Sequence, residues 1–246
     1  MPVDAAGFRG GDRTEIELPA VQRRVVEALK TAGKRIVFVN FSGAAIALEP
    51  ESQNCEAILQ AWYPGQAGGQ AVAEVLFGDY NPAGKLPLTF YRNLAQIPDF
   101  EDYNMTGRTY RYMKETPLFP FGHGLSYTTF KYGKLKMNDD KIAAGQNLNL
   151  VIPVTNTGSR DGDEVVQVYL KKMDDTEGPV KTLRAFKRVR IPAGKTVEVK
   201  FSLDDTQLEW WDEQSNTMRV CPGNYTVMIG GTSCEKSLLS RTFTIR

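Results

Sequence analysis

Hydrophobic residues recur along this chain with two different periods, and the change from one to the other divides the chain into two parts. In the stretch PAVQRRVVEALKTAGK, residues 19–34, apolar side chains return every four positions at Val21, Val25 and Leu29. This spacing predicts an amphipathic helix. The stretch also offers a proline able to start the helix and a glycine able to end it.

Two continuous apolar runs and a second helical stretch follow in the first part. RIVFVNFSG (35–43) and AILQAWYPG (57–65) are typical of strands buried on both faces. GQAGGQAVAEVLFGD (65–79) predicts a helix closed by Gly78, and NPAGKLPLTF (81–90) predicts a turn followed by another strand. Because strands and helices alternate, we expect an α/β layer with a parallel or mixed sheet.

The second part has the alternation of β-strands. Between Tyr91 and Tyr132 the periodicity fades into a segment rich in aromatic, proline, glycine and arginine residues, and from about Phe130 the period becomes two. Short strands are predicted in NLNLVIPVTNTG, EVVQVYLKKM, LRAFKRVRI, TVEVKFSL, NYTVMIGG and RTFTIR. This spacing fits a β-sandwich of immunoglobulin or fibronectin type III kind. We therefore expect an α/β domain over residues 1–134 and a β-sandwich over residues 135–246.

Composition and charge narrow the possible partners. The 246 residues are 41% hydrophobic, and 30 lysines and arginines balance 29 acidic residues. Such a chain has no net field to attract nucleic acid or an anionic membrane. The longest apolar run, Ile36 to Phe41, is too short to span a bilayer, and no export signal is expected near Met1. Neither nucleic acid nor a membrane is expected as a partner.

The cysteines and glycines do not indicate a metal or a cofactor. Cys55, Cys221 and Cys234 are odd in number and lack C-x-x-C spacing, which argues against a zinc site and a disulfide framework. Free thiols are expected, with a Cys221–Cys234 bridge as the alternative. GQAGGQ (65–70) is neither G-x-G-x-x-G nor a Walker loop, so we expect it to serve close packing rather than phosphate binding.

Candidate ligand-binding residues gather in the aperiodic segment. The single histidine, His123, stands in PFGHGLSY, and no G-x-S-x-G motif accompanies it. It either orders this loop by hydrogen bonding or contacts a substrate. GRTYRYM supplies Arg108, Tyr110, Arg111 and Tyr112, which could clamp a ligand, because arginine pairs with carboxylates and stacks on rings. Packing on a neighbouring domain is an equal alternative for these four.

Other acidic and aromatic residues give weaker indications. The pairs Glu15/Glu17 and Glu101/Asp102 could in principle supply glycosidase carboxylates, yet nothing in their spacing selects them over solvated charges. The Trp210-Trp211 pair could form a stacking platform for sugars. Alternation along a strand, with one ring in the core, is the competing interpretation.

Several long motifs carry a family resemblance. Three motifs resemble the C-terminal α/β domain of glycoside hydrolase family 3, the family of β-glucosidases and β-xylosidases. They are AWYPGQAGGQAVAEVLFGDYNPAGKLPLTF, GRTYRY and PLFPFGHGLSYTTF. The second part resembles the fibronectin type III-like domain that ends many of these enzymes. The resemblance implies a retaining mechanism on two carboxylates and β-linked oligosaccharides as substrates. Within the family, these motifs are most similar in sequence to those of bacterial β-xylosidases.

The resemblance transfers no catalytic residue to this sequence. It implies a nucleophilic aspartate on an N-terminal barrel, for which this chain has no room. It also implies an acid/base glutamate shortly before a Gly-Asp-Arg motif. Gly11-Asp12-Arg13 matches that motif, but the preceding MPVDAAGFRG holds no glutamate.

Other residues are transferred in weaker roles only. Asp12 and Arg13 are expected to order their loop. The resemblance implies contact with the barrel, or with the entrance to its active site, at Arg108, Tyr110, Arg111, Tyr112 and His123.

We therefore expect the C-terminal portion of a family 3 glycosidase, inactive alone, without metal or cofactor. Its expected partners are the missing barrel domain and the β-linked oligosaccharide that the complete enzyme hydrolyses. Self-association through uncovered apolar surface is a further expectation. The parent protein is expected in the periplasm or outside the cell. The alternative function is a carbohydrate-binding or adhesion module.

Overall fold

The computed structural model describes residues 15–99 and 101–246, and the chain forms two compact units. The first, here called the α/β unit, comprises the chain up to Tyr80 together with Leu88–Thr109 and Met113–Phe119. The second, the sandwich unit, comprises Asn81–Pro87, Tyr110–Tyr112 and Pro120–Arg246. The expected α/β and all-β architectures are thus both present.

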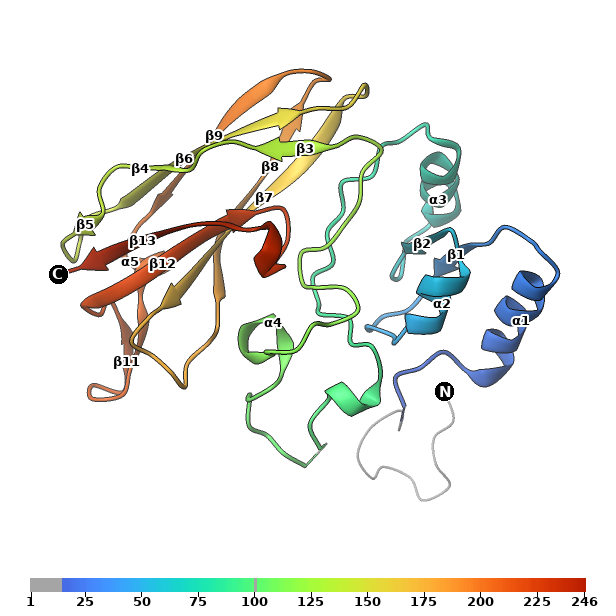
Figure 1. The fold of residues 1–246 in the computed structure, drawn as a ribbon, viewed down its shortest axis with the longest axis horizontal. Coiled ribbons are helices and arrows are strands. Elements are labelled where there is room, and N and C mark those ends of the chain that lie inside the picture. Colours follow the sequence, from blue (N-terminus) through green and yellow to red (C-terminus); the bar gives the residue numbers. More distant parts are fainter. Residues whose placement is uncertain (1–14, 100) are drawn as a thin grey trace. The chain divides into compact units, whose positions relative to one another are not determined.

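The α/β unit is built on a short parallel sheet. Its two strands pair in parallel with Val37 opposite Ala57 and Asn40 opposite Gln60. The expectation that both apolar runs are buried on both faces is wrong, because Val37–Asn40 buries Asn40 but leaves Val37 51% exposed, and Ala57–Gln60 has no buried residue. Figure 1 shows three helices gathered around these strands. The elements are α1 (Ala20–Thr31), β1 (Val37–Asn40), α2 (Glu49–Asn54), β2 (Ala57–Gln60), α3 (Gly68–Phe77) and the 3-10 turn η1 (Leu94–Gln96).

Helix α1 forms where the periodicity places it, but its predicted apolar face is uncovered. Its buried residue is Val26, and the Arg23 guanidinium meets the fully buried Glu51 carboxylate of α2 at 3.0 Å. The predicted stripe stands in solvent, with side chains exposed by 62% at Val21, 56% at Val25 and 41% at Leu29.

Glycines close and tighten α3 as expected. Gly78 ends this helix in the left-handed conformation, with φ 85°, which glycine adopts without steric cost. At Gly68 a Cβ atom would lie 2.5 Å from Cγ of Pro64. The glycine-rich stretch before α3 therefore permits close packing of backbone against the proline ring.

The strand predicted within residues 81–90 is wrong. Leu86 instead exchanges two backbone hydrogen bonds with the glycine-rich loop: its N–H donates to the His123 carbonyl and its carbonyl accepts from Gly122, both at 2.8 Å. Pro87 follows directly and has no N–H to extend a ladder. Farther on, Phe90 makes an isolated bridge to Phe119.

The sandwich unit consists of two main sheets, and all six predicted strands are confirmed. One sheet has the order β5-β13-β12-β7-β8; in the other, β6 pairs with β3, β4 and β9. Its main strands are β3 (Phe130–Tyr132), β4 (Lys136–Met137), β5 (Lys141–Ile142), β6 (Leu148–Asn156), β7 (Gly162–Lys172), β8 (Thr182–Ile191), β9 (Thr196–Leu203), β12 (Gly223–Gly230) and β13 (Leu239–Ile245). The remaining elements are the hairpin β10 (Trp210–Asp212) and β11 (Thr217–Arg219), with the short helices α4 (Thr109–Tyr112), α5 (Asp205–Leu208) and η2 (Glu235–Ser237).

Alternation along these strands builds the core. Strand β6 buries every second residue from Leu148 to Asn156, as a strand with one face on the core must. Each fully buried aliphatic side chain contributes about 1.5–3 kcal/mol. Trp210 and Trp211 follow the same rule, the first 3% and the second 50% exposed, which confirms the alternation interpretation.

The expectation of free thiols is met. Cys55, Cys221 and Cys234 are free thiols. In the described part of the chain, no helix is long and apolar enough to cross a membrane.

Candidate functional site

The candidate residues of the aperiodic segment separate into distinct environments. Asp12 and Arg13 lie outside the described residues. Arg108 belongs to the α/β unit, whereas Tyr110, Arg111, Tyr112 and His123 belong to the sandwich unit.

Arg108 holds a loop of the α/β unit together. Its guanidinium donates to the backbone carbonyls of Asn104 at 3.1 Å, Asp99 at 2.9 Å and Asp102 at 2.5 Å. A planar fork of several N–H groups suits such convergent acceptors, which a lysine could not reach together. These bonds join Arg108 to the backbone of Asp99, Asp102 and Asn104.

Tyr110 and Arg111 pack against the sandwich. The Tyr110 ring stacks on Phe121 with centroids 4.3 Å apart and meets Tyr169 edge-on at 5.9 Å. Its hydroxyl accepts a hydrogen bond from the Leu183 amide at 3.2 Å. The Arg111 carbonyl accepts from Val180 at 2.6 Å. Of the two alternatives for this motif, these contacts support packing.

Tyr112 and His123 complete this anchored region. The Arg111 guanidinium lies over the Tyr112 ring, 5.5 Å from its centroid. The His123 backbone ties the glycine-rich loop down through Leu86 and Pro120. Burial, and secondarily the nearby Lys85 charge, lower the pKa of His123. These contacts support the loop-ordering role of His123.

A buried ionic cluster that no sequence pattern indicates lies beside this loop. The Glu164 carboxylate receives the Tyr132 hydroxyl at 2.9 Å and the Lys85 ammonium at 3.4 Å, and its side chain is 5% exposed. Burial raises the pKa of Glu164, while Lys85 opposes this shift. No single sequence motif connects Lys85, Tyr132 and Glu164, so only the fold brings them together.

The acidic pairs serve local backbone groups. Glu17 accepts hydrogen bonds from the amides of Ile16 at 3.2 Å and Leu94 at 3.3 Å. Asp102 accepts from the Asn104 amide at 2.9 Å, and this bond lowers the pKa of Asp102. Neither arrangement is a glycosidase pair. Among the described residues, no three histidine, cysteine or acidic side chains gather as metal ligands would.

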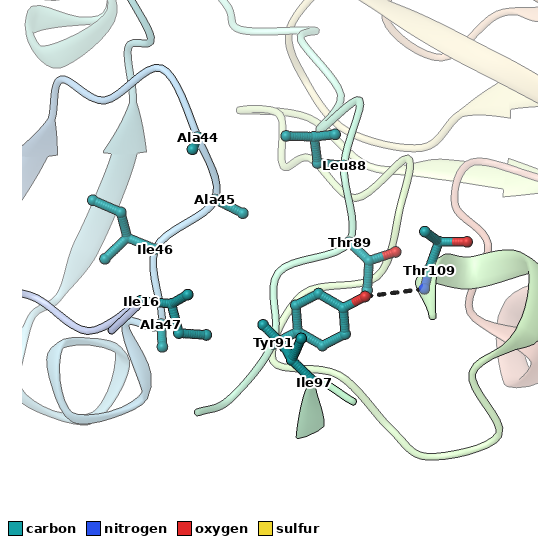
Figure 2. Close-up of a pocket in the computed structure, with 10 residues that line it drawn as sticks. All are labelled: Ile16, Ala44, Ala45, Ile46, Ala47, Leu88, Thr89, Tyr91, Ile97 and Thr109. Atoms are coloured by element: carbon teal, nitrogen blue, oxygen red, sulfur yellow. Dashed lines mark hydrogen bonds between the residues drawn. The ribbon is translucent and has the colours of Figure 1, made fainter. Parts of the chain in front are cut away.

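The α/β unit contains a hollow of about 280 Å³. One wall is formed by Ile16 and residues 44–47, which follow strand β1; Figure 2 shows a second wall facing it. That second wall is formed by Leu88, Thr89, Tyr91, Ile97 and Thr109. Ligands of open α/β sheets bind beyond the carboxyl ends of strands, which is where the first wall begins. The sequence AAIAL gave no signal of a site, because it contains only apolar side chains.

The polar groups of the hollow are few. The Tyr91 hydroxyl accepts a hydrogen bond from the Thr109 amide at 3.0 Å, drawn as the dashed line in Figure 2. Thr109 has φ +56°, unusual for a β-branched residue and often found at functional sites. Within the described chain, the buried Thr89 hydroxyl has no hydrogen-bond partner.

Comparison with known proteins assigns the family. The sequence profile of the glycosyl hydrolase family 3 C-terminal domain matches residues 4–127, and that of the fibronectin type III-like domain matches residues 164–233. The chain belongs to glycosyl hydrolase family 3. It matches the C-terminal portion that the resemblance of its motifs implied.

Individual relatives agree with this assignment. The chain is 55% identical over 245 residues to a xylan 1,4-beta-xylosidase of Xylanibacter ruminicola, spanning all of this chain and 28% of that protein. A periplasmic beta-glucosidase of Salmonella typhimurium is 39% identical, over 91% of this chain and 31% of its own length. The solved β-glucosidase of Erythrobacter marinus superposes with a TM-score of 0.85 at 38% identity, over 98% of this chain and 32% of its own. The chain thus spans about a third of these relatives.

Proposed function

We propose that this family 3 chain is the C-terminal portion of a retaining exo-β-glycosidase that hydrolyses xylo- or gluco-oligosaccharides. The observation that carries the proposal is the 55% identity to a xylan 1,4-beta-xylosidase over 245 residues. Within that enzyme, the chain supplies an α/β layer and a sandwich, while the two catalytic carboxylates come from outside the described residues. We place the boundary between the two domains between residues 134 and 135. This position lies between the ranges matched by the two family profiles, residues 4–127 and 164–233.

The test is an assay of nitrophenol release from aryl β-xyloside and β-glucoside. We expect no turnover by the 246-residue chain alone, and turnover when it is joined to, or mixed with, a family 3 barrel fragment. Clear turnover by the chain alone that disappears on substitution of an acid within it would contradict the proposal. Comparing the two aryl glycosides also decides between xylose and glucose.

The proposal extends to compartment and assembly. Because one relative is named a periplasmic beta-glucosidase, we place the complete protein in the periplasm or outside the cell. Self-association of the chain by itself is proposed from the exposed stripe on α1.

A carbohydrate-binding module is the second candidate. Burial of Trp210 removes half of the supposed stacking platform, whereas Trp211 is 50% exposed and Tyr103 is 89% exposed. Titration of the chain with xylan and cello-oligosaccharides in a calorimeter tests this candidate. Absence of binding heat with both xylan and cello-oligosaccharides would exclude the carbohydrate-binding module.

A further inference from the structure

We propose that a hollow on the sandwich unit, here called the sheet hollow, binds a short xylo-oligosaccharide through its hydroxyl groups. The sheet hollow is lined by residues of β12 and β13, by residues at the start of β5 and by those that follow β7. The choice of xylose as the sugar rests on the proposed glycosidase function, whereas the binding of a hydroxyl-rich ring rests on the sheet hollow alone. The proposal adds a binding surface to the proposed hydrolysis.

Strand pairing places a row of polar side chains across three strands. Asn224 lies opposite Thr244 in the β12–β13 pair, and Thr244 lies opposite Lys141 in the β13–β5 pair. Paired residues project from the same face of a sheet, and their neighbours in sequence project from the other face. Two such neighbours, Tyr225 and Phe243, are buried in the core, 0% and 2% exposed. The polar row therefore lies on the outer face of the sheet.

The sheet hollow is large enough for a sugar. It measures about 450 Å³, and Figure 1 shows β5, β13 and β12, which supply most of its floor, side by side near the C-terminus. Pockets that hold small molecules measure about 300–1,000 Å³, and a cavity of about 150 Å³ takes one benzene ring. One or two pyranose rings therefore fit.

The lining offers both donors and acceptors of hydrogen bonds. Asn224 Oδ1 accepts from Thr244 Oγ1 at 3.0 Å, so the Asn224 side-chain amide can donate to a ligand. Asp174 Oδ2 accepts from the Asn224 backbone amide at 3.2 Å, so its second oxygen can accept from a ligand. The Lys141 side chain is exposed and adds an ammonium donor. A sugar hydroxyl donates and accepts, so it can pair with each of these groups.

The charges around the sheet hollow balance. Asp140 and Asp174 supply two carboxylates, and Lys141 supplies an ammonium group. A second cation is close, because a Cβ atom at Gly223 would lie 3.0 Å from the Asp174 carboxylate and 3.5 Å from Cε of Lys172. Neither an anion nor a cation is favoured by such a set. A neutral, polar ligand matches it.

Apolar atoms between the polar groups suit the C–H faces of a sugar ring. The Met173 side chain is 47% exposed and lines the sheet hollow, and its sulfur accepts the Thr226 hydroxyl at 3.0 Å. Thr242, also exposed, adds a methyl group. A thioether is polarizable and adapts to irregular surfaces. The mixture of polar and apolar atoms therefore fits a sugar better than a purely apolar ring.

The experiment is a titration of the 246-residue chain with xylobiose and, separately, with cyclohexanol, followed by amide chemical shifts. Xylobiose has six-membered rings with several hydroxyls, whereas cyclohexanol has one six-membered ring with a single hydroxyl. Xylobiose is expected to shift the amides of residues 140–141, 173–174, 224 and 242–244 in a saturable way. Cyclohexanol is expected to leave them unmoved.

Two variants test the lining directly. Asn224→Leu removes the side-chain amide and fills part of the sheet hollow, so it should weaken xylobiose binding at least tenfold. Lys141→Met keeps a long side chain without the ammonium group and should weaken binding severalfold. Because the Lys141 side chain is exposed, Lys141→Met retains the fold and decides the matter if Asn224→Leu does not fold.

Two controls separate this surface from others. Asn149→Leu makes the same replacement at an exposed position of β6, in the other sheet, and should leave xylobiose binding unchanged. Trp211→Ala removes a ring that is 50% exposed and should also leave it unchanged. The proposal is overturned by an absence of shifts with xylobiose, by xylobiose shifts confined to the surroundings of Trp211, or by saturable shifts of the same amides with cyclohexanol or calcium chloride alone. Unaltered xylobiose binding in the folded Asn224→Leu and Lys141→Met variants would also overturn it.

The outcome is separable from that of the glycosidase proposal. The titration requires no turnover, so its failure leaves the proposed reaction standing. Conversely, absence of turnover in a longer protein leaves sugar binding by the sheet hollow standing.

Discussion

Glu164 brings a carboxylate into the interior of the sandwich unit, where only two partners meet it. Tyr132 donates to it at 2.9 Å and Lys85 approaches to 3.4 Å. Such buried pairs add little net stability, yet losing one partner leaves the other charge uncompensated. The cluster joins Lys85, in the segment of residues 81–90, to strand β7.

The pH dependence of stability should reveal this carboxylate. Because burial raises the folded-state pKa of Glu164 above its ordinary 4.5, the folded chain holds this proton to higher pH than the unfolded chain. The stability contributed by this group is full below the ordinary pKa and is lost as pH rises through the folded value. In urea unfolding across that window, Glu164→Gln should show a midpoint that depends less on pH than the wild type.

Lys85→Met supplies the complementary measurement. Removing the cation leaves the buried Glu164 carboxylate without its positive partner, which should cost about 3 kcal/mol at neutral pH and less in acid, where the carboxylate is protonated. Identical pH profiles for Glu164→Gln and the wild type would contradict this account of the cluster.

At the scale of elements, the Tyr110–Tyr112 part of the GRTYRY motif packs within the sandwich unit. Tyr110 contributes a stacked ring at 4.3 Å from Phe121 and an acceptor for the Leu183 amide. Tyr110→Ala should therefore lower the unfolding free energy of the sandwich unit by about 2–4 kcal/mol. Tyr110→Phe, which loses only the hydroxyl, should lower it by about 1 kcal/mol.

Chemical denaturation followed by tryptophan fluorescence measures both effects, since Trp210 lies in the same unit. Tyr103→Ala is the control, because that ring is 89% exposed and should change the free energy of unfolding little. Equal stability of Tyr110→Ala and Tyr103→Ala would show that the contacts of Tyr110 do not stabilise the sandwich unit.

The elements also show where sequence reasoning works. The six long strands of the sandwich were predictable because each buries one face, so apolar and polar residues alternate along the strand. The strand expected within residues 81–90 failed because Leu86 pairs with the distant residues Gly122 and His123. Helix α1 was predictable from its period. Whether its apolar face is buried depends on which other elements pack against it, and the period of one helix carries no information about that.

The same limit applies to the candidate site. Motifs picked out Arg108 and Tyr110, whose polar and aromatic side chains stand out, and the structure shows Arg108 hydrogen-bonded to backbone carbonyls and Tyr110 stacked on Phe121. The hollow could not be predicted from the sequence, because the alanines at 44, 45 and 47 and Ile46 carry no polar or charged group. A cavity arises from what side chains leave empty, and that requires coordinates.

At the scale of the whole molecule, the two units differ in how completely they bury apolar surface. The sandwich unit has a continuous core contributed by both sheets, whereas the α/β unit rests on two strands of four residues each. A sheet of only two strands is marginally stable by itself in water. Apolar residues of the α/β unit that stand in solvent include Val21, Val25, Leu29, Val37 and Phe77.

This exposed surface leads to the last prediction, that the chain alone self-associates. In sedimentation velocity, the weight-average mass should rise above that of a monomer with increasing concentration, and added sulfate should strengthen the effect. Val25→Lys places a charge in the middle of the α1 stripe, whose side chain is 56% exposed, and should shift the chain toward monomer without unfolding it. Met218→Lys, at a residue 44% exposed in the sandwich unit, is the control and should associate like the wild type. A wild-type chain that stays monomeric, or equal association of the two variants, would show that the stripe is not an adhesive surface.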